Sequence, residues 1–249
     1  MNPYEQARVL HTYLLFHYAP REHIVAGSPL EAVAGSLDDA FFQFPTATVT
    51  EMFDLGRAPY DRALDLGCAV GRSTFELSKY AREVIGIDYS RTFIDAADAL
   101  RCGRTLAYHR YTESHLAETL MTRVPDDAQP VATQFEVGDA MDLRDDLGHF
   151  DLVHAANLLC RLSEPARLLE RLPDLVKPGG QLVLATPTTW LEDYTPREAQ
   201  PPGPTLDYLR AGLESDFELI RVTDLPFLIR EHARKFQLST SQTSLWRRR

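Results

Sequence analysis

The chain has 249 residues, of which 44% are hydrophobic and 25% are charged, and this composition suits one globular domain with additions. Its formal net charge of −10 argues against a nucleic-acid-binding surface, which needs a basic patch. No apolar run approaches the roughly 18 residues of a membrane span, so the sequence predicts no association with a membrane.

The first part of the chain predicts a helical extension. Apolar and aromatic residues recur at helical spacing over residues 3–18, and a second helix is predicted at 46–56. We expect residues 1–58 to form this extension and residues 59–249 to form the main domain. Together they make a single compact unit.

Strands and helices alternate from residue 61 onward. Apolar segments predict strands at 61–66, 83–88, 133–137, 149–156 and 180–186, and amphipathic segments predict helices at 71–81, 91–101 and 164–175. Residues 102–132 form an insertion, which we expect to be a flap or a hairpin. The pattern ends with a predicted helix at 205–215 and predicted strands at 217–227 and 242–247.

A glycine turn follows the first strand. The run LDLGCAVGR at 64–72 places Gly67 and Gly71 between an apolar segment and an amphipathic one, so that backbone can approach a ligand closely. The spacing Asp65-x-Gly67-x-x-x-Gly71 differs from the dinucleotide G-x-G-x-x-G, and no P-loop lysine follows. It therefore suits a nucleoside ligand better than a nucleotide.

Two later strands end in acids. The segment VIGID ends at Asp88, where a carboxylate can accept both ribose hydroxyls. The segment FEVGD ends at Asp139, where a carboxylate is placed to accept an adenine amino group. With a Gly-Gly turn at 179–180, this ordered set resembles the class I S-adenosylmethionine-dependent methyltransferases over about residues 60–186.

That resemblance implies a Rossmann-like α/β fold with a seven-stranded, mostly parallel sheet, helices on both faces and an N-terminal helical lid over the cofactor. The strand at 242–247 would run antiparallel between those at 180–186 and 217–227. The implied cofactor is S-adenosylmethionine, with no metal. Asp65 orients the glycine turn, Asp88 takes the ribose, and the full set of predicted cofactor residues is Asp65, Gly67, Cys68, Gly71, Arg72, Asp88, Tyr89, Asp139, Ala140 and Ala156.

Four further segments, at 2–18, 155–165, 187–196 and 226–237, resemble the methyltransferase domain of ovothiol biosynthesis. This family transfers a methyl group from S-adenosylmethionine to the imidazole π nitrogen of 5-thiohistidine, giving ovothiol A. Its domain occurs fused behind an iron-dependent sulfoxide synthase or as a separate protein. The resemblance implies the stand-alone form, with a functional link to such a synthase.

Several residues are candidates for work on the acceptor. Asn157 follows the fourth strand, and its amide can both donate and accept while it orients the acceptor ring. His17 and His232 are candidate proton acceptors, and Arg230 and Arg234 are candidate clamps for a carboxylate. The remaining candidates are acids for an ammonium group and aromatic rings for stacking or cation–π contact: Glu5, Glu231, Tyr13, Trp190 and Tyr194.

The cysteines favour a reducing compartment. Cys68, Cys102 and Cys160 are far apart and form no C-x-x-C pair, so a zinc site is not predicted and the cytoplasm is the expected location. Because a fold does not fix its acceptor, two alternatives stay open. One is a methyltransferase for another small histidine-like or carboxylate acceptor, and the other is a non-catalytic subunit that docks on a sulfoxide synthase.

Overall fold

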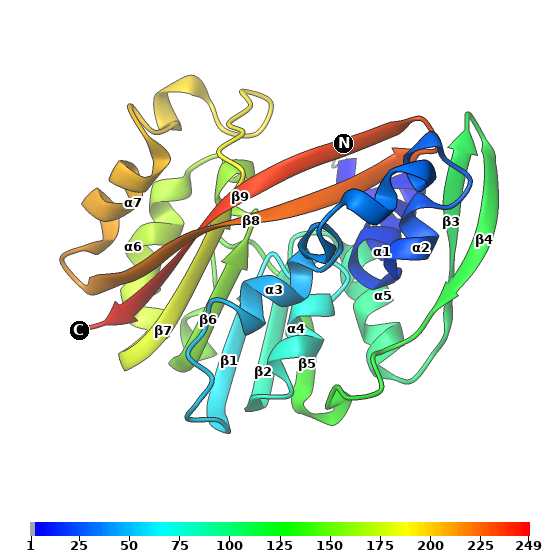
Figure 1. Cartoon of the computed structure of the whole chain (residues 1–249). Coiled ribbons are helices and arrows are strands. Elements are labelled where there is room, and N and C mark those ends of the chain that lie inside the picture. The colour runs from blue at the N-terminus through cyan, green and yellow to red at the C-terminus, as the bar shows by residue number, and fades with distance from the viewer. Residues whose placement is uncertain (1–2) are drawn as a thin grey trace.

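A seven-stranded sheet forms the centre of the computed structural model, which describes residues 3–249 (Figure 1). Its strands, in spatial order, are β5 (Thr133–Val137), β2 (Ala81–Asp88), β1 (Tyr60–Leu66), β6 (Phe150–Ala156), β7 (Val176–Thr186), β9 (Lys235–Arg248) and β8 (Phe217–His232). The strands from β5 to β7 pair in parallel, and β9 is antiparallel to β7 and β8. The predicted Rossmann-like fold is confirmed.

Side chains alternate along each strand and point to opposite faces of the sheet. Both of these faces are buried. In β1, Leu64 and Leu66 pack into the core on one face, and Ala63 packs into the core on the other. All three are fully buried. Such near-continuous apolar runs are typical of parallel strands covered on two sides.

Helices supply the two outer layers. They are α1 (Ala7–Tyr18), α2 (Arg21–Val25), α3 (Phe44–Thr50), α4 (Arg72–Leu77), α5 (Arg91–Arg101), α6 (Pro165–Leu175) and α7 (Thr205–Leu213). Apolar side chains of α6 and α7 pack together on one face of the sheet, and those of α3 and α4 meet the other face. Short 3-10 turns lie at Pro3–Glu5, Pro29–Ala32, Ala34–Ser36, Asp39–Phe42, Pro130–Ala132, Asp145–Leu147, Leu159–Arg161 and Arg197–Ala199.

Two predicted helices are shorter than the sequence pattern indicated. Helix α3 ends at Thr50. Four residues later, both amide atoms of Gln181 bond to the backbone of Asp54, at 2.7 and 3.0 Å, and fix the chain beside β7. Helix α4 ends at Leu77. The Ser78 hydroxyl then donates to the carbonyl oxygen of Phe75 at 2.6 Å, and β2 begins three residues later.

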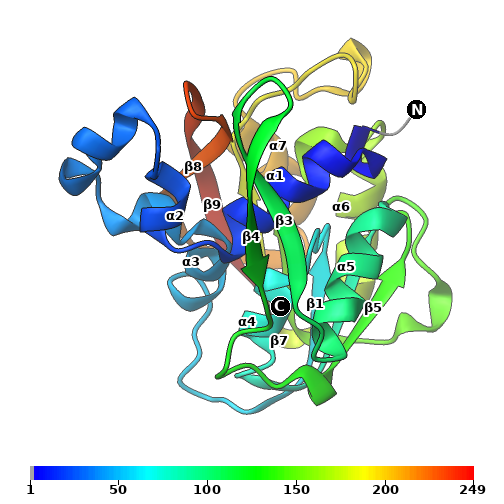
Figure 2. The same cartoon turned by 90° about the vertical axis from the view of Figure 1, so that its right-hand side faces the viewer.

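The insertion at 102–132 contains a separate antiparallel hairpin, β3 (Leu106–Glu113) and β4 (Leu116–Thr122). Helix α1 runs alongside β3 (Figure 2). The hairpin and the helical extension therefore cover the same end of the molecule.

The strands β8 and β9 are longer than the predicted 217–227 and 242–247. The segment 228–236, which we expected to form a loop between them, is mostly strand. Pairing continues from Leu228↔Leu238 to His232↔Lys235, which leaves a two-residue turn. The extension persists because it packs against α1 and β3, contacts between distant segments that a local pattern does not report.

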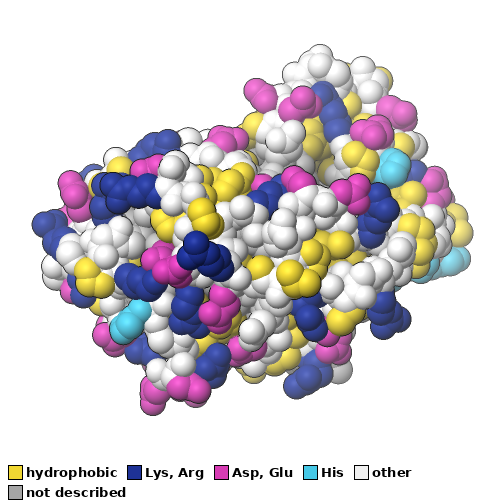
Figure 3. Space-filling model, turned by 90° about the horizontal axis from the view of Figure 1, so that it is seen from below, with side chains coloured by type: hydrophobic (Ala, Val, Ile, Leu, Met, Phe, Trp, Pro, Cys, Tyr) yellow, Lys and Arg dark blue, Asp and Glu magenta, His cyan; other side chains and the backbone are white. Residues whose placement is uncertain are grey.

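The surface carries mixed charge on the side that Figure 3 shows, where basic and acidic side chains intermingle. Within residues 3–249, no helix has both the length and the apolar character to cross a membrane.

Candidate active site

A cavity opens at the carboxyl ends of β1, β2 and β6. Asp65, Gly67, Asp88, Ala156 and Asn157 line it from the ends of these strands and the turns after them. The chain runs from β1 out to β2 and β5 and then returns to β6 on the other side of β1, so the strand order reverses beside β1, and ligands of such folds bind at this edge. We call this the inner cavity.

Two positions in the turn after β1 leave little room for a side chain. Gly67 and Gly71 have φ angles of 69° and 85°, which glycine adopts without strain. A Cβ atom on Gly71 would lie 2.8 Å from Cζ of Phe135, and one on Gly67 would lie 3.1 Å from Cδ1 of Leu158. Gly67 lines the inner cavity, and Gly71 precedes the first residue of α4.

A buried polar network fixes the start of this turn. Oδ2 of Asp65 accepts from the hydroxyl of Thr74 at 2.6 Å, and Oδ1 lies 2.7 Å from Nδ1 of His154. Nε2 of His154 lies 3.0 Å from Oγ1 of Thr48, on α3. Each of these four side chains is at most 1% exposed. The network gives Asp65 contacts suited to orienting the turn.

Sequence analysis missed His154 in this role. The available signal was a histidine in the otherwise apolar segment 150–156. Its meaning depends on the pairing of β6 with β1, which places His154 directly beside Asp65.

Asp88 ends β2 and faces the inner cavity. Its Oδ2 accepts from the backbone N–H of Ala69 at 2.9 Å, and its Oδ1 accepts from that of Ser90 at 2.8 Å. Burial raises the pKa of this carboxyl to about 6, although both hydrogen bonds act to lower it. A carboxylate at this position can accept two neighbouring hydroxyl groups.

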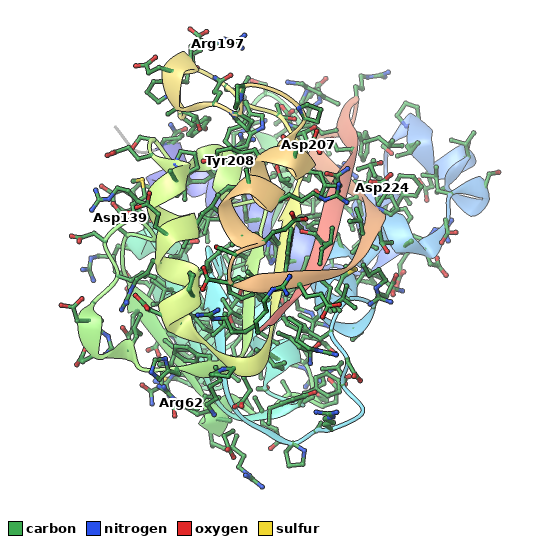
Figure 4. All side chains as sticks on the ribbon, turned by 90° about the vertical axis from the view of Figure 1, so that its left-hand side faces the viewer. Arg62, Asp139, Arg197, Asp207, Tyr208 and Asp224 are labelled. Carbon is green, nitrogen blue, oxygen red and sulfur yellow. The ribbon has the colours of Figure 1, made fainter. Side chains whose placement is uncertain are left out.

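Three residues predicted to contact adenine lie outside the lining of the inner cavity. Tyr89 is 66% exposed, and Ala140 is buried in the core. Oδ1 of Asp139 accepts from the backbone N–H of Met141 at 2.8 Å. In the view of Figure 4, Asp139 lies above Arg62, the third residue of β1.

The N-terminal segment roofs the inner cavity. Tyr4, Tyr13 and His17 line it, and the hydroxyl of Ser90 donates to the backbone oxygen of Tyr4 at 3.1 Å. The rings of Tyr4 and Tyr13 also pack on Phe93 of α5. Residues 3–18 therefore lie over the ends of β1 and β2.

The side chain of Glu5 attaches this N-terminal roof, residues 3–18, to α5. Its carboxylate accepts from the backbone N–H groups of Arg91 and Thr92 at 3.0 and 3.2 Å, and from the Thr92 hydroxyl at 2.5 Å. Glu5 lines neither this cavity nor the one that adjoins it. Its carboxylate caps a helix here, and this position does not suit the predicted contact with a ligand ammonium group.

His17 is a weak proton acceptor. Burial, with a contribution from Arg72, lowers the pKa of its imidazole to about 3, so the ring is neutral at physiological pH and is far from the pKa that suits a general base. Its Nδ1 has no hydrogen-bond partner among residues 3–249. Arg72 pairs with Glu76 at 3.0 Å and lies beside His17 in a neighbouring surface pocket, outside the inner cavity.

A second, outer cavity continues from the first. The two share Tyr4, Tyr13, Asn157, Arg161 and Ile229. The outer cavity is lined further by α1, the loop after β7 and the β8–β9 hairpin, with Arg8, Val9, Thr12, Pro187, Thr189, Leu191, Tyr194, Phe227, Glu231, Gln237 and Ser239.

Asn157 lies at the junction of the two cavities. It has a φ angle of 55°, and its backbone N–H donates to Ala185 at 2.8 Å. Its Oδ1 accepts from the hydroxyl of buried Ser241 at 2.6 Å. No hydrogen bond to its Nδ2 is found within residues 3–249, so the amide donors are available to a ligand.

Arg161 also lies at the junction, and sequence analysis missed it. Its Nη1 donates to the carbonyl oxygens of Cys160 and Thr189, both at 3.1 Å. Its guanidinium carbon lies 4.8 Å from the ring centroid of Tyr194. The segment 155–165 was assigned by resemblance, but the sequence does not show which of its side chains turn inward.

The cysteines are free thiols. Cys68 lines the inner cavity, and burial raises the pKa of both Cys68 and Cys160. No group of three or more histidine, cysteine or acidic side chains suited to a metal ion occurs in the described part of the chain.

A family model described as a methyltransferase domain matches residues 37–240. The chain belongs to this methyltransferase family. It carries an S-adenosylmethionine-dependent methyltransferase domain, and the glycine turn and Asp88 lie at the carboxyl edge of its sheet.

Known relatives of this methyltransferase act on varied acceptors. It is 27% identical to ubiquinone biosynthesis O-methyltransferase of Methylococcus capsulatus over 53% of this chain and 46% of that protein. It is 25% identical to probable thiol methyltransferase 2 of Arabidopsis thaliana over 72% of this chain and 69% of that protein. The chain spans less than half the length of the ubiquinone enzymes that it matches.

Solved structures share the fold. N-methyltransferase NodS from Bradyrhizobium japonicum, in complex with S-adenosyl-L-homocysteine, aligns over 94% of this chain and 98% of its own, with a TM-score of 0.53 and 15% identity. A TehB-like S-adenosylmethionine-dependent methyltransferase from Corynebacterium glutamicum aligns over 88% and 94%, with a TM-score of 0.52 and 17% identity.

Besides Glu5, four residues predicted to act on the methyl acceptor lie outside both cavities. Arg230 donates to the carbonyl oxygens of Ile24, Ala26 and Tyr111 at 2.8, 2.7 and 3.3 Å. It cannot clamp a ligand in the outer cavity, since side chains alternate along β8 and its neighbours Ile229 and Glu231 face that cavity instead. Arg234 is exposed in the hairpin turn. Nδ1 of His232 accepts from the backbone N–H of Arg234. Nε1 of Trp190 donates to Thr205 at 3.0 Å.

Proposed function

We propose that this methyltransferase transfers the methyl group of S-adenosylmethionine to the π nitrogen of the 5-thiohistidine imidazole, giving ovothiol A. One observation carries the proposal. The four segments that resemble the ovothiol family, at 2–18, 155–165, 187–196 and 226–237, are far apart in the sequence, yet each contributes side chains to the outer cavity. Because the segments that carry the resemblance surround one cavity, they favour the same acceptor as in the ovothiol family.

The inner cavity suits the donor. Gly67, Cys68 and Asp88 are the residues that would hold it, with the carboxylate of Asp88 accepting the ribose hydroxyls. Bound S-adenosylmethionine supplies an electrophilic methyl group on a sulfonium centre. Asp139 and Ala140 are proposed to contact the adenine edge, and Tyr89 its face.

The outer cavity suits a ring acceptor. The aromatic rings of Tyr4, Tyr13 and Tyr194 surround the entrance to the inner cavity. Holding the acceptor nitrogen about 3 Å from the methyl carbon supplies most of the rate by itself. Because the ring nitrogen attacks with its own lone pair, we propose no general base, in agreement with the lowered pKa of His17.

Selectivity for nitrogen over sulfur is the harder task, since a thiolate is the stronger nucleophile. The hydroxyl of Ser241 fixes the amide of Asn157. We propose that Nδ2 of Asn157 donates to the acceptor thiolate, keeps the sulfur away from the methyl group, and turns the ring nitrogen toward it. The acceptor is proposed to come from an iron-dependent sulfoxide synthase.

A mass-spectrometric assay tests the function. Purified protein is incubated with S-adenosylmethionine and 5-thiohistidine, with histidine as the control acceptor, and the product is fragmented to locate the methyl group. We expect a methyl on the π nitrogen and no turnover of histidine. A methyl on sulfur would assign a thiol methyltransferase, and binding of S-adenosylhomocysteine without any product would exclude this acceptor.

A further inference from the structure

Among residues 3–249, one guanidinium that lines the outer cavity is half-buried and has no acidic partner. No carboxylate lies within 4.0 Å of the side-chain nitrogens of Arg161 in residues 3–249, whereas Arg62 and Arg72 pair with Glu83 and Glu76 at 2.9 and 3.0 Å. Only Nη1 of Arg161 makes hydrogen bonds, to two backbone carbonyls. Its remaining N–H groups are therefore left for a ligand.

The position of this guanidinium is fixed before any ligand arrives. The carbonyl oxygens of Cys160 and Thr189 hold one edge of it, and the ring of Tyr194 covers it at 4.8 Å. A planar fork held in this way matches the two oxygens of a carboxylate. Removing a cation from water without an anion is unfavourable, and a bound carboxylate would remove that penalty.

The other arginine that lines the outer cavity does not offer the same site. Arg8 is exposed, its Nη1 donates to the backbone oxygen of Ser114 at 2.9 Å, and its guanidinium lies over the ring of Tyr111 at 4.1 Å. It is engaged with the β3–β4 hairpin. Arg161, in contrast, lines both cavities.

A carboxylate in the same cavity complements Arg161. Glu231 projects from β8 and is the acidic side chain that lines the outer cavity within the described residues. It pairs with Nζ of Lys235 at 2.8 Å, and Gln237 donates to it at 2.8 Å. The Lys235 side chain is 60% exposed, so this ion pair is weak, and Glu231 can share its charge with a second cation.

We propose that the outer cavity binds its acceptor as a free α-amino acid, with Arg161 anchoring the α-carboxylate and Glu231 receiving the α-ammonium group. This rests on the proposed function for the identity of the ring. It adds the two residues that select the zwitterion over an amine without the carboxylate or a residue within a peptide.

The test compares two acceptors and two variants. The acceptors are 5-thiohistidine and its decarboxylated analogue 5-thiohistamine. The variants are Arg161→Gln and a control, Arg210→Gln. The control removes an exposed arginine from α7. We expect Arg161→Gln to raise the KM for 5-thiohistidine about 10- to 100-fold, as for loss of a charge-assisted pair, and to change the KM for 5-thiohistamine less than about threefold. Wild type and Arg210→Gln should prefer 5-thiohistidine by a similar factor.

Further measurements separate this proposal from competing explanations. Calorimetry with S-adenosylhomocysteine should give the same Kd for wild type and Arg161→Gln, and the melting temperature reports folding. A selective loss of S-adenosylhomocysteine affinity would show that Arg161 binds the donor's carboxylate and would overturn the proposal. So would equal loss of activity toward both acceptors by a folded variant.

A final measurement tests the role of Arg161 even if the proposed function is wrong. If wild type methylates neither acceptor, calorimetric titration of the S-adenosylhomocysteine complex with histidine and histamine still tests the anchor. Binding of histidine that Arg161→Gln abolishes supports it, and equal binding of histidine and histamine contradicts it.

Discussion

Nδ1 of His154 lies 2.7 Å from Oδ1 of Asp65, and both side chains are 1% exposed. This contact joins neighbouring strands β6 and β1 directly below the glycine turn. Through Thr48, the same histidine reaches α3 in the N-terminal extension. The donor site and the extension therefore share one buried polar network.

Replacing His154 by Phe should destabilise the protein. The substitution leaves a buried carboxylate without one partner, which costs about 2–4 kcal/mol, and it should also weaken binding of S-adenosylhomocysteine. Urea denaturation and calorimetry measure the two effects. The matched control is His149→Phe, at an exposed histidine that bonds to Asp174, and equal stability of the two variants would contradict the role of the network.

Replacing Gly71 by Ala should cost more than replacing Gly103 by Ala. Both glycines have positive φ angles, 85° and 78°, but a Cβ meets Phe135 at 2.8 Å only at Gly71 and meets nothing within 4 Å at Gly103. We expect about 1 kcal/mol of backbone strain in both variants and a further 1–3 kcal/mol at Gly71 from overpacking. Chemical denaturation gives the difference, and identical losses would show that space is not limiting at the turn.

Donor affinity should fall below about pH 6. The carboxyl of Asp88 has a pKa of about 6 in the folded protein, and we propose that its ionised form accepts the ribose hydroxyls. The Kd for S-adenosylhomocysteine should therefore rise by up to about tenfold for each pH unit below 6. In Asp88→Asn, the Kd should be higher and nearly independent of pH between 5 and 8, and a pH dependence that survives this substitution would point to another group.

The same ionisation has the opposite effect on stability. Folding raises the pKa of Asp88 from 3.8 to about 6, so the native state holds this proton more tightly than the unfolded chain does. Its contribution to stability is complete below about pH 4 and declines as the pH rises to about 6. Comparing the pH dependence of the melting temperature in wild type and Asp88→Asn isolates this contribution.

Glu5→Ala should speed release of the spent donor. Glu5 fixes the N-terminal roof to the first turn of α5 through three hydrogen bonds, so its loss should let the roof open more often. We expect S-adenosylhomocysteine to dissociate about 3- to 10-fold faster, as for loss of about 1 kcal/mol of capping interaction. Rapid filtration with labelled ligand measures this rate, and Glu22→Ala on α2 is the control for charge. Unchanged dissociation would mean that the roof does not control release.

The sequence predicted those parts of the fold that depend on local pattern. The apolar strand before Gly67 and the segment ending at Asp88 are contiguous signals, and both lie at the cavity as their spacing indicated. The strand ends and the glycine turn at the inner cavity could therefore be predicted without a structure. Tyr89 and Asp139 were chosen by the same logic. Neither lines the inner cavity, and their contact with adenine stays a prediction.

The acceptor half was less accessible because it is built from pairings between distant segments. Arg230 was predicted to bind a ligand because the segment was expected to be a loop. Continued pairing of β8 with β9 instead turns Arg230 away from the cavity and Glu231 toward it. The indole N–H of Trp190 donates to Thr205. Arg161 can be identified only from the structure, where no acid among residues 3–249 pairs with it.

Arg230 has a consequence for how the protein is made. Its guanidinium bonds to backbone oxygens of Ile24, Ala26 and Tyr111, and synthesis on the ribosome runs from the N-terminus. Those three carbonyls stay without this partner until residue 230 has been translated. The hydrogen bonds that join β8 to Ile24, Ala26 and the β3–β4 hairpin can therefore form only after the last hairpin has been synthesised.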